Sequence, residues 1–218
     1  MNTVGNIQWQ KSLGGTDMEH AVGVEQTAEG DYFVAGDASS TDGDVLNNRG
    51  YEDYWILQLS NDIKMCPAAV TKKVAAGVHS ASNIYQWQID TGAGFTNISN
   101  NTNYSGALSD TLTITNPLTS WYGYKYRCVI ITGSVAVNGE PAKLKFGVTW
   151  TGVQNNLWNN PANWDCNVIP DANTDVVIPA GVSNYPVVNI NTSVRSVTVS
   201  QGATISVLPG ITLLLTGP

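Results

Sequence analysis

The sequence is poor in charged residues and has no long hydrophobic run, and each shortage excludes a class of protein. Charged side chains make up 12% of the 218 residues, about half of the usual share. Only 10 of them are lysine or arginine. Because a nucleic-acid-binding face needs clustered basic residues, nucleic acid is not an expected partner. The leucine run Leu213–Leu215 is far too short to cross a bilayer, so we expect no membrane insertion.

Motifs that carry catalysis or bind cofactors are also missing. The sequence contains no nucleophile elbow, phosphate loop or zinc signature, and its two histidines, His20 and His79, lie far apart. We therefore expect a protein that is not an enzyme and requires no cofactor. Met1–Gly5 lacks the basic flank and apolar stretch of a secretion signal. Either a leader was removed or, as we favour, the chain is a segment of something longer.

What the sequence contains instead is the pattern of an all-β protein. Short runs of Val, Thr, Ile, Tyr and Trp alternate with Gly, Asn, Asp and Pro, and no window shows sustained helical periodicity. We predict three small consecutive modules, at residues 1–62, 63–147 and 148–218. The acidity belongs to the first of them, because residues 1–64 hold 11 acidic and 3 basic side chains while the remainder holds 6 and 7.

The first module is expected to be a four-stranded, blade-like antiparallel sheet with a tight turn between its second and third strands. The predicted strands are 7–11, 21–26, 32–36 and 54–59, and the turn is 29–31. The residues resemble a repeat of secreted proteins from Bacteroidota-type bacteria. The matching pieces are Trp9–Gly15, Gln26–Thr27, Gly30–Tyr32, Ser39–Asp44 and Gly50–Trp55. The resemblance implies a series of such blades, and one thin sheet cannot bury both of its faces alone.

The second module has the pattern of an immunoglobulin-like β-sandwich. Side chains alternate along 85–89 and 124–130, and Trp87 is followed by Tyr126 two residues before Cys128, as in the tyrosine corner of that fold. The stretch resembles bacterial immunoglobulin-like domains of the same class of secreted proteins. Cys66 lies too early for the usual second strand, so a Cys66–Cys128 disulfide would hold the first strand instead. Whether those two cysteines pair is left open.

The third module begins with a segment rich in tryptophan and asparagine, 150–166. It resembles the opening of β-solenoid-like modules in surface proteins of the same bacteria. The second cysteine that often accompanies that pattern is absent, which leaves Cys166 without an expected partner. Three apolar triplets follow at eight-residue spacing, starting at Val197, Ile205 and Leu213. Regular rungs of this kind predict a solenoid or a tight meander.

Three groups of residues are candidate binding or modification sites. Asp37, Asp42, Asp44 and Asp53 form an oxygen-rich stretch that would suit calcium, although Asp, Ser and Gly are also ordinary turn residues. Trp150, Trp158 and Trp164 would form a sugar-binding platform if exposed, and would be core residues if buried. Thr111, in Asp110–Leu112, fits a short acceptor pattern resembling O-glycosylation sites of Bacteroidota-type secreted proteins, a match that also arises by chance.

These features predict an extracellular structural or adhesive surface protein that assembles into a fibre or stalk. Its partners would be other copies of itself, the flanking modules of a longer chain, or surface glycans. The alternative is a carbohydrate-binding appendage of a larger secreted hydrolase. Uncovered apolar side chains on the first sheet and on the last rung of the third module are the reason to expect self-association.

Overall fold

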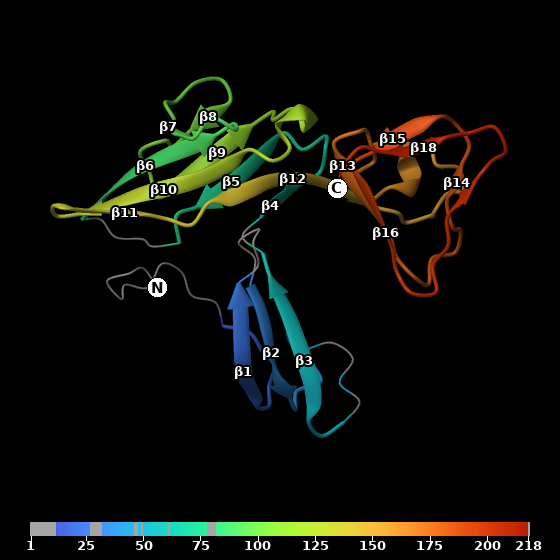
Figure 1. The fold of residues 1–218 in the computed structure, drawn as a ribbon, viewed down its shortest axis with the longest axis horizontal. Coiled ribbons are helices and arrows are strands. Elements are labelled where there is room, and N and C mark those ends of the chain that lie inside the picture. The colour runs from blue at the N-terminus through green and yellow to red at the C-terminus, as the bar shows by residue number, and fades with distance from the viewer. Residues whose placement is uncertain are drawn as a thin grey trace. The chain divides into compact units, whose positions relative to one another are not determined.

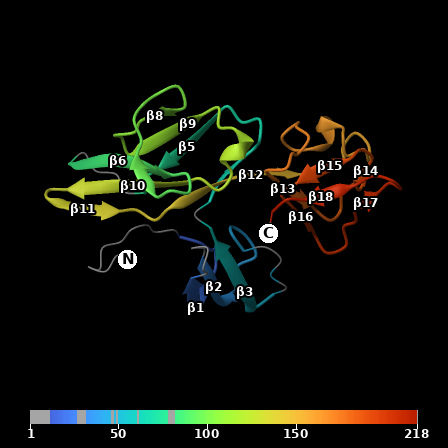
Figure 2. The same cartoon turned by 45° about the horizontal axis from the view of Figure 1, so that its top comes forward.

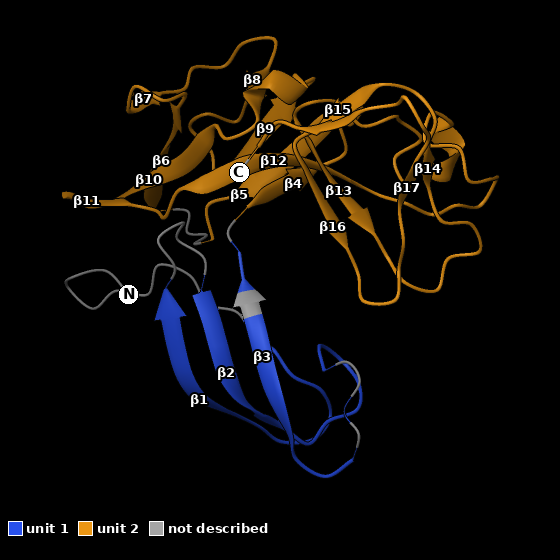
Figure 3. Ribbon diagram, turned by 45° about the vertical axis from the view of Figure 1, so that its right-hand side comes forward, with its two compact units in different colours: residues 1–61 blue, residues 62–218 orange. Residues whose placement is uncertain are grey.

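A computed structural model describes residues 12–26, 32–45, 48, 50–60, 62–77 and 82–217 of the chain. The fold is nearly all β, as predicted, with two short 3-10 helices among the described residues, η1 (Thr119–Trp121) and η2 (Pro161–Asn163). The chain divides into two compact units, 1–61 and 62–218, rather than three (Figure 3). No helix in the described part of the chain is long and apolar enough to span a membrane.

Unit 1 contains an antiparallel sheet in the order β1-β2-β3 (Figure 3). Its strands are β1 (Glu19–Gln26), β2 (Tyr32–Ala38) and β3 (Asp53–Leu59). The register between β1 and β2 shifts at Val22, which forms a bulge. These strands confirm three of the four predicted for the first module. The predicted strand 7–11 and turn 29–31, like His79, lie outside the described residues.

Unit 2 begins with a β-sandwich whose two layers are visible in Figure 2. One layer, in the order β5-β9-β8, contains β5 (Thr71–Ala75), β9 (Thr111–Thr115) and β8 (Tyr104–Ser105). The other layer contains β4 (Ile63–Met65), β6 (Asn83–Asp90), β7 (Phe95–Asn97), β10 (Lys125–Thr132), β11 (Val135–Asn138) and β12 (Ala142–Thr149).

The sandwich core follows the predicted alternation. Trp87 on β6 lies opposite Cys128 on β10, and both side chains are buried together with Tyr126. Every second residue of β12 is buried as well, from Ala142 to Val148. The hydroxyl of Tyr126 lies 3.1 Å from that of Tyr104. The hydrogen bond at this corner therefore involves a second tyrosine, where an immunoglobulin tyrosine corner uses the backbone.

A parallel β-solenoid follows the sandwich (Figure 1). Its first rung comprises β13 (Thr174–Ile178), β14 (Val187–Val188) and β15 (Thr192–Val194), and its second comprises β16 (Ser196–Val199), β17 (Ser206–Val207) and β18 (Leu213–Leu215). Each strand of the second rung pairs in parallel with its counterpart in the first. The pairing is that of a solenoid, not of a meander. The eight-residue repeat therefore marks successive sides of one rung, and not the stacked rungs that the sequence suggested.

Strand β12 joins the sandwich to the solenoid. Its first residues pair with β10 and β4, and its last four, Phe146–Thr149, pair in parallel with β13. The boundary predicted between residues 147 and 148 therefore falls inside one continuous strand. Two hydrophobic cores meet at that strand, because Phe146 belongs to the sandwich core and Val148 to the solenoid core. The two predicted modules form one compact unit for this reason.

Candidate functional site

The sheet of unit 1 has almost no buried core. Among the described residues of this unit, only Ala38, Ser40 and Val45 are buried, and all three lie at or beyond the end of β2. Alternation along β3 puts apolar residues on both faces, since Trp55 and Leu57 face one side and Ile56 the other. Ile56 is 71% exposed. Unpartnered apolar side chains of this kind are typical of an interaction surface.

One face of this sheet carries a groove of about 330 Å³. Its apolar lining comes from all three strands and the segment before β1, and includes Leu13, Val34, Trp55, Leu57 and Leu59. Gly36 also lines the groove, and an added Cβ there would meet the backbone carbonyl of His20. The close approach of β1 to β2 therefore requires glycine there. The sequence predicted the strands but not this groove, whose shape depends on the pairing of β1 with β2.

Polar groups line the same groove. Glu19 and His20 contribute to it, and the Nδ1 of His20 lies 2.9 Å from Oδ2 of Asp37. This contact raises the pKa of His20 above its ordinary value of 6.5, because the carboxylate accepts a hydrogen bond from the imidazole and favours its charged form. The groove is therefore apolar with an exposed, pH-sensitive pair beside it.

The four aspartates predicted to bind calcium do not converge. Asp37 contacts His20, and Asp44 accepts a hydrogen bond from the backbone N–H of Gly14. Asp42 accepts from the N–H of Thr16 at 2.8 Å, whereas Asp53 is the first residue of β3. Within the described ranges, no group of three or more His, Cys, Asp or Glu side chains is placed to hold a metal ion. The four aspartates therefore do not form the expected calcium site, and Asp42 and Asp44 instead accept hydrogen bonds from backbone amides of the segment before β1.

The three tryptophans proposed as a sugar platform are core residues. Trp150, Trp158 and Trp164 are 0%, 0% and 2% exposed. Trp164 packs edge to face against both neighbours, with ring centroids 4.9 Å and 4.7 Å apart. Its Nε1 donates to the carbonyl of Trp158, while the Nε1 of Trp158 is itself buried without a hydrogen-bond partner. Rings buried to this extent cannot stack on a glycan, so the sugar-platform interpretation is wrong and the packing interpretation is confirmed.

Buried polar groups fix the loop that carries these rings. The side chain of Asn163 is fully buried and accepts hydrogen bonds from the N–H groups of Gln154 and Asn155. Its amide nitrogen donates to the carbonyl of Leu157 at 3.0 Å. Asn residues in this segment therefore satisfy backbone groups that burial would otherwise leave unpaired, which explains the Trp/Asn composition in structural terms.

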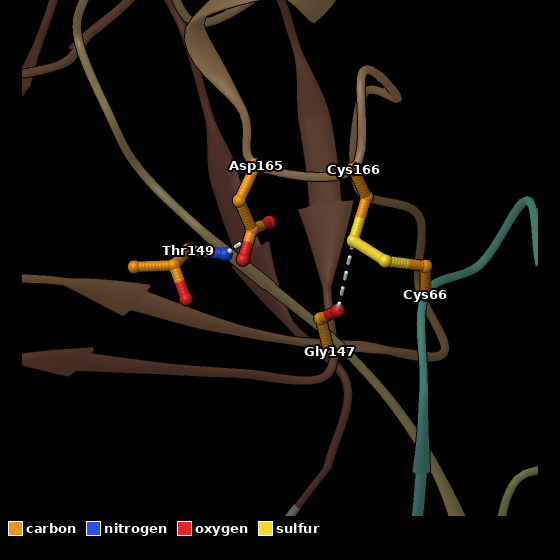
Figure 4. The surroundings of a disulfide bond; sticks show 5 residues. All are labelled: Cys66, Gly147, Thr149, Asp165 and Cys166. Atoms are coloured by element: carbon orange, nitrogen blue, oxygen red, sulfur yellow. Dashed lines mark hydrogen bonds between the residues drawn. A yellow bond between two sulfur atoms is a disulfide. The ribbon is translucent and has the colours of Figure 1, made fainter.

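The disulfide joins Cys66 to Cys166, so the expected Cys66–Cys128 pairing is wrong (Figure 4). Cys66 follows β4 directly, and Cys166 lies in the loop between β12 and β13. Both meet beside β12, where the Sγ of Cys166 lies 3.8 Å from the carbonyl oxygen of Gly147. The remaining thiol, Cys128, is buried in the sandwich. Burial raises its pKa to about 11.

A second set of contacts connects the sandwich to the solenoid. The hydroxyl of Tyr122 donates to Asp175 on β13 at 2.5 Å, and the guanidinium of Arg195 lies 4.1 Å from the centre of the Tyr122 ring. Burial, together with the hydrogen bond to Asp175, raises the pKa of Tyr122 to about 12. Thr119 donates to Asp171 at 2.6 Å. Together with the disulfide and β12, these contacts make the sandwich and the solenoid one body.

The proposed glycosylation acceptor, Thr111, is the first residue of β9 and pairs with Ala75. Its side chain is half-buried. Nothing in this geometry bears on attachment of a sugar, which stays a prediction.

Comparison with known proteins adds one finding. Residues 149–217 match a family model described as a domain of unknown function (DUF8693). The match begins at the last residue of β12 and covers the Trp/Asn segment and both rungs of the solenoid. The solenoid is thus a recurring module. A comparison with curated proteins found no match.

Proposed function

We propose that this chain is a structural or adhesive part of an extracellular surface protein, and that it acts by binding other protein surfaces rather than by catalysis. The observation that carries the proposal is the sheet β1–β3, which has apolar side chains on both faces and, among the described residues of unit 1, only three buried residues, all at or beyond the end of β2. Such a sheet gains stability only when another layer covers it. A partner with a flat apolar sheet face fits this need best.

The disulfide supports an extracellular location. Structural disulfides persist in oxidising compartments and are rare in the cytosol. The low charge content and the Thr-, Asn- and Ser-rich strands are compatible with that setting. The proposal includes assembly into a fibre or stalk of repeated modules, in line with the resemblance to Bacteroidota-type surface proteins.

The alternative of a carbohydrate-binding appendage is not favoured. Its candidate residues were Trp150, Trp158 and Trp164, and these rings are inside the solenoid core. No other specific observation points to a sugar, so we retain the structural role alone.

The proposal can be tested on the source cells by immuno-electron microscopy with an antibody against the 218-residue chain. We expect label on projecting material of intact, unpermeabilised cells. Label found only after permeabilisation would contradict the proposal, and label on a soluble hydrolase that contains this chain would favour the alternative.

A matched pair of variants tests the role of the sheet. Ile56→Lys puts a charge on an exposed face of β3, whereas Met18→Lys puts the same charge on a residue, 62% exposed, just before β1. Ile56→Lys should reduce incorporation of the chain into the surface material, and Met18→Lys should not. Equal incorporation of both variants would show that the sheet β1–β3 does not take part in assembly.

A further inference from the structure

The disulfide joins two segments of unit 2 that are held in place to different degrees. Cys66 follows the short strand β4, and Cys166 lies in the loop between β12 and β13, beside Thr149 and Asp165 (Figure 4). Both cysteine side chains are half-buried, so a small reductant can reach the bond. The other contacts of each segment therefore decide which of them moves when the bond is broken.

The segment of Cys166 is fixed without the disulfide. The N–H of Thr149 donates to Oδ1 of Asp165 at 2.8 Å, and the N–H of Asp165 donates to the carbonyl of Thr149 at 3.0 Å. Trp164, two residues before Cys166, is 2% exposed and belongs to the solenoid core. These contacts hold the loop against the end of β12 whether or not the sulfur atoms are joined.

The segment of Cys66 depends far more on the disulfide. β4 is only three residues long, and in the described part of the chain it pairs with β12 alone. Before the strand, Oδ2 of Asp62 lies 2.5 Å from Nζ of Lys145, and Ile63 and Met65 are its buried side chains. Segments with few backbone hydrogen bonds open locally at a lower free energy than core strands do. β4 is thus clamped at both ends, by an ion pair before it and by a covalent bond after it.

We propose that the disulfide is a redox latch on β4: its reduction releases β4 from β12, while the solenoid and the other sandwich strands stay folded. A dithiol reductant opens the bond by thiol–disulfide exchange. One of its thiolates attacks a sulfur atom of the bridge and forms a mixed disulfide, and its second thiolate then displaces the protein thiol. The protein gains two electrons and two protons as two thiols, and the reductant leaves as a disulfide.

The released segment is short and well defined. It ends before β5, because Ala69 packs against the sandwich core and the carbonyl of Val70 accepts a hydrogen bond from the N–H of Asn116 at 2.7 Å. Since unit 2 begins at Asp62, opening the latch lengthens the connection between the two units by residues 62–66. It also uncovers the edge of β12 at Leu144–Phe146, which pairs with β4 in the closed form.

The two thiols of one reduced molecule provide the first test. The whole 218-residue chain is reduced with dithiothreitol, freed of reductant without oxygen and pulsed with iodoacetamide, and alkylation of each cysteine is measured by mass spectrometry. Cys66 should react more than about tenfold faster than Cys166, because thiol reactivity requires access and only the segment of Cys66 leaves its place. Asp165→Ala, the matched variant, should raise the rate at Cys166 and leave that at Cys66 unchanged. Equal rates in the unmodified chain, or faster reaction of Cys166, would overturn the latch.

Hydrogen exchange provides the second test. On reduction, amides of β4 should lose protection by about tenfold more than those of β6, β10 and β13, because opening is local. Cys66→Ala/Cys166→Ala should show the reduced pattern without reductant, whereas oxidised Cys128→Ala should keep the pattern of the oxidised chain. A uniform loss across unit 2 would mean that the bond stabilises only the whole fold, and would reject the latch. The latch does not rest on the proposed surface role, so its failure would leave that proposal intact.

Discussion

Removing the Cys66–Cys166 disulfide should destabilise unit 2 strongly. The bridge joins residues 100 apart in sequence. In the chain-entropy model, closing a loop of that length lowers the entropy of the unfolded chain by an amount worth about 4.7 kcal/mol. Cys166 is only half-buried, so replacing both cysteines with alanine removes little packing. The free energy of unfolding of Cys66→Ala/Cys166→Ala should therefore fall by about 4–5 kcal/mol.

The assay is thermal and urea unfolding of the full chain, followed by tryptophan fluorescence with and without dithiothreitol. In a unit of this size each kcal/mol corresponds to about 2–4 °C, so the melting temperature should fall by about 10–20 °C. Reductant should lower the stability of the unmodified protein to that of the double variant and leave the double variant unchanged.

Cys128→Ala is the matched control, because Cys128 is buried and unbridged. It should lower stability modestly and remain sensitive to reductant. If Cys128→Ala abolished the sensitivity to reductant, the pairing would be wrong. If complete reduction of the unmodified protein changed the melting temperature by less than about 4 °C, the loop-closure argument itself would be refuted.

Three further predictions concern single residues. Trp164→Ala should lower the free energy of unfolding by about 3–5 kcal/mol, because it empties the solenoid core, whereas Val153→Ala should change it by less than about 0.5 kcal/mol in the same urea titration. Cys128 should resist iodoacetamide at pH 8 in the native protein and react once per chain after denaturation, since burial raises its pKa to about 11; rapid alkylation of the native protein would contradict that burial. NMR titration should give His20 a pKa above 6.5 that is lower in Asp37→Asn. Because the folded pKa is raised, the contribution of this pair to stability is complete below pH 6.5 and is lost as pH rises through the folded pKa.

Local alternation was enough to predict two strands of the sandwich, β6 and β10. Tyr126, Cys128 and the residues of β6 opposite them show the two-residue period because one face of each strand is buried. The same reasoning found β1–β3. It could not show that Trp150, Trp158 and Trp164 are buried, since nearby asparagines serve equally well in an exposed loop or a packed one.

Local alternation of apolar and polar residues could not predict contacts between distant segments of the chain. The partner of Cys66 depends on parallel pairing of the three-residue strand β4 with β12, and a strand of that length has no period to detect. In the solenoid, Gly202 and Gly210 adopt positive φ and mark corners, so their eight-residue spacing separates the sides of one rung and not, as the sequence suggested, stacked rungs. Each strand of the second rung stacks on a first-rung strand about twenty residues earlier in the chain, and no sequence repeat of that length indicates the pairing.

The position of the disulfide has a mechanical consequence. A pulling force that enters unit 2 at its first residues reaches Cys66 just after β4 and crosses to Cys166 through the sulfur–sulfur bond. The chain between them, which includes the sandwich strands from β5 to β12, lies outside the load path. A stretched oxidised chain would thus be shorter by about 330–360 Å of contour than a reduced one. Under tension, the sandwich strands from β5 to β12 would carry no load, and the force would act on β4 and on the solenoid.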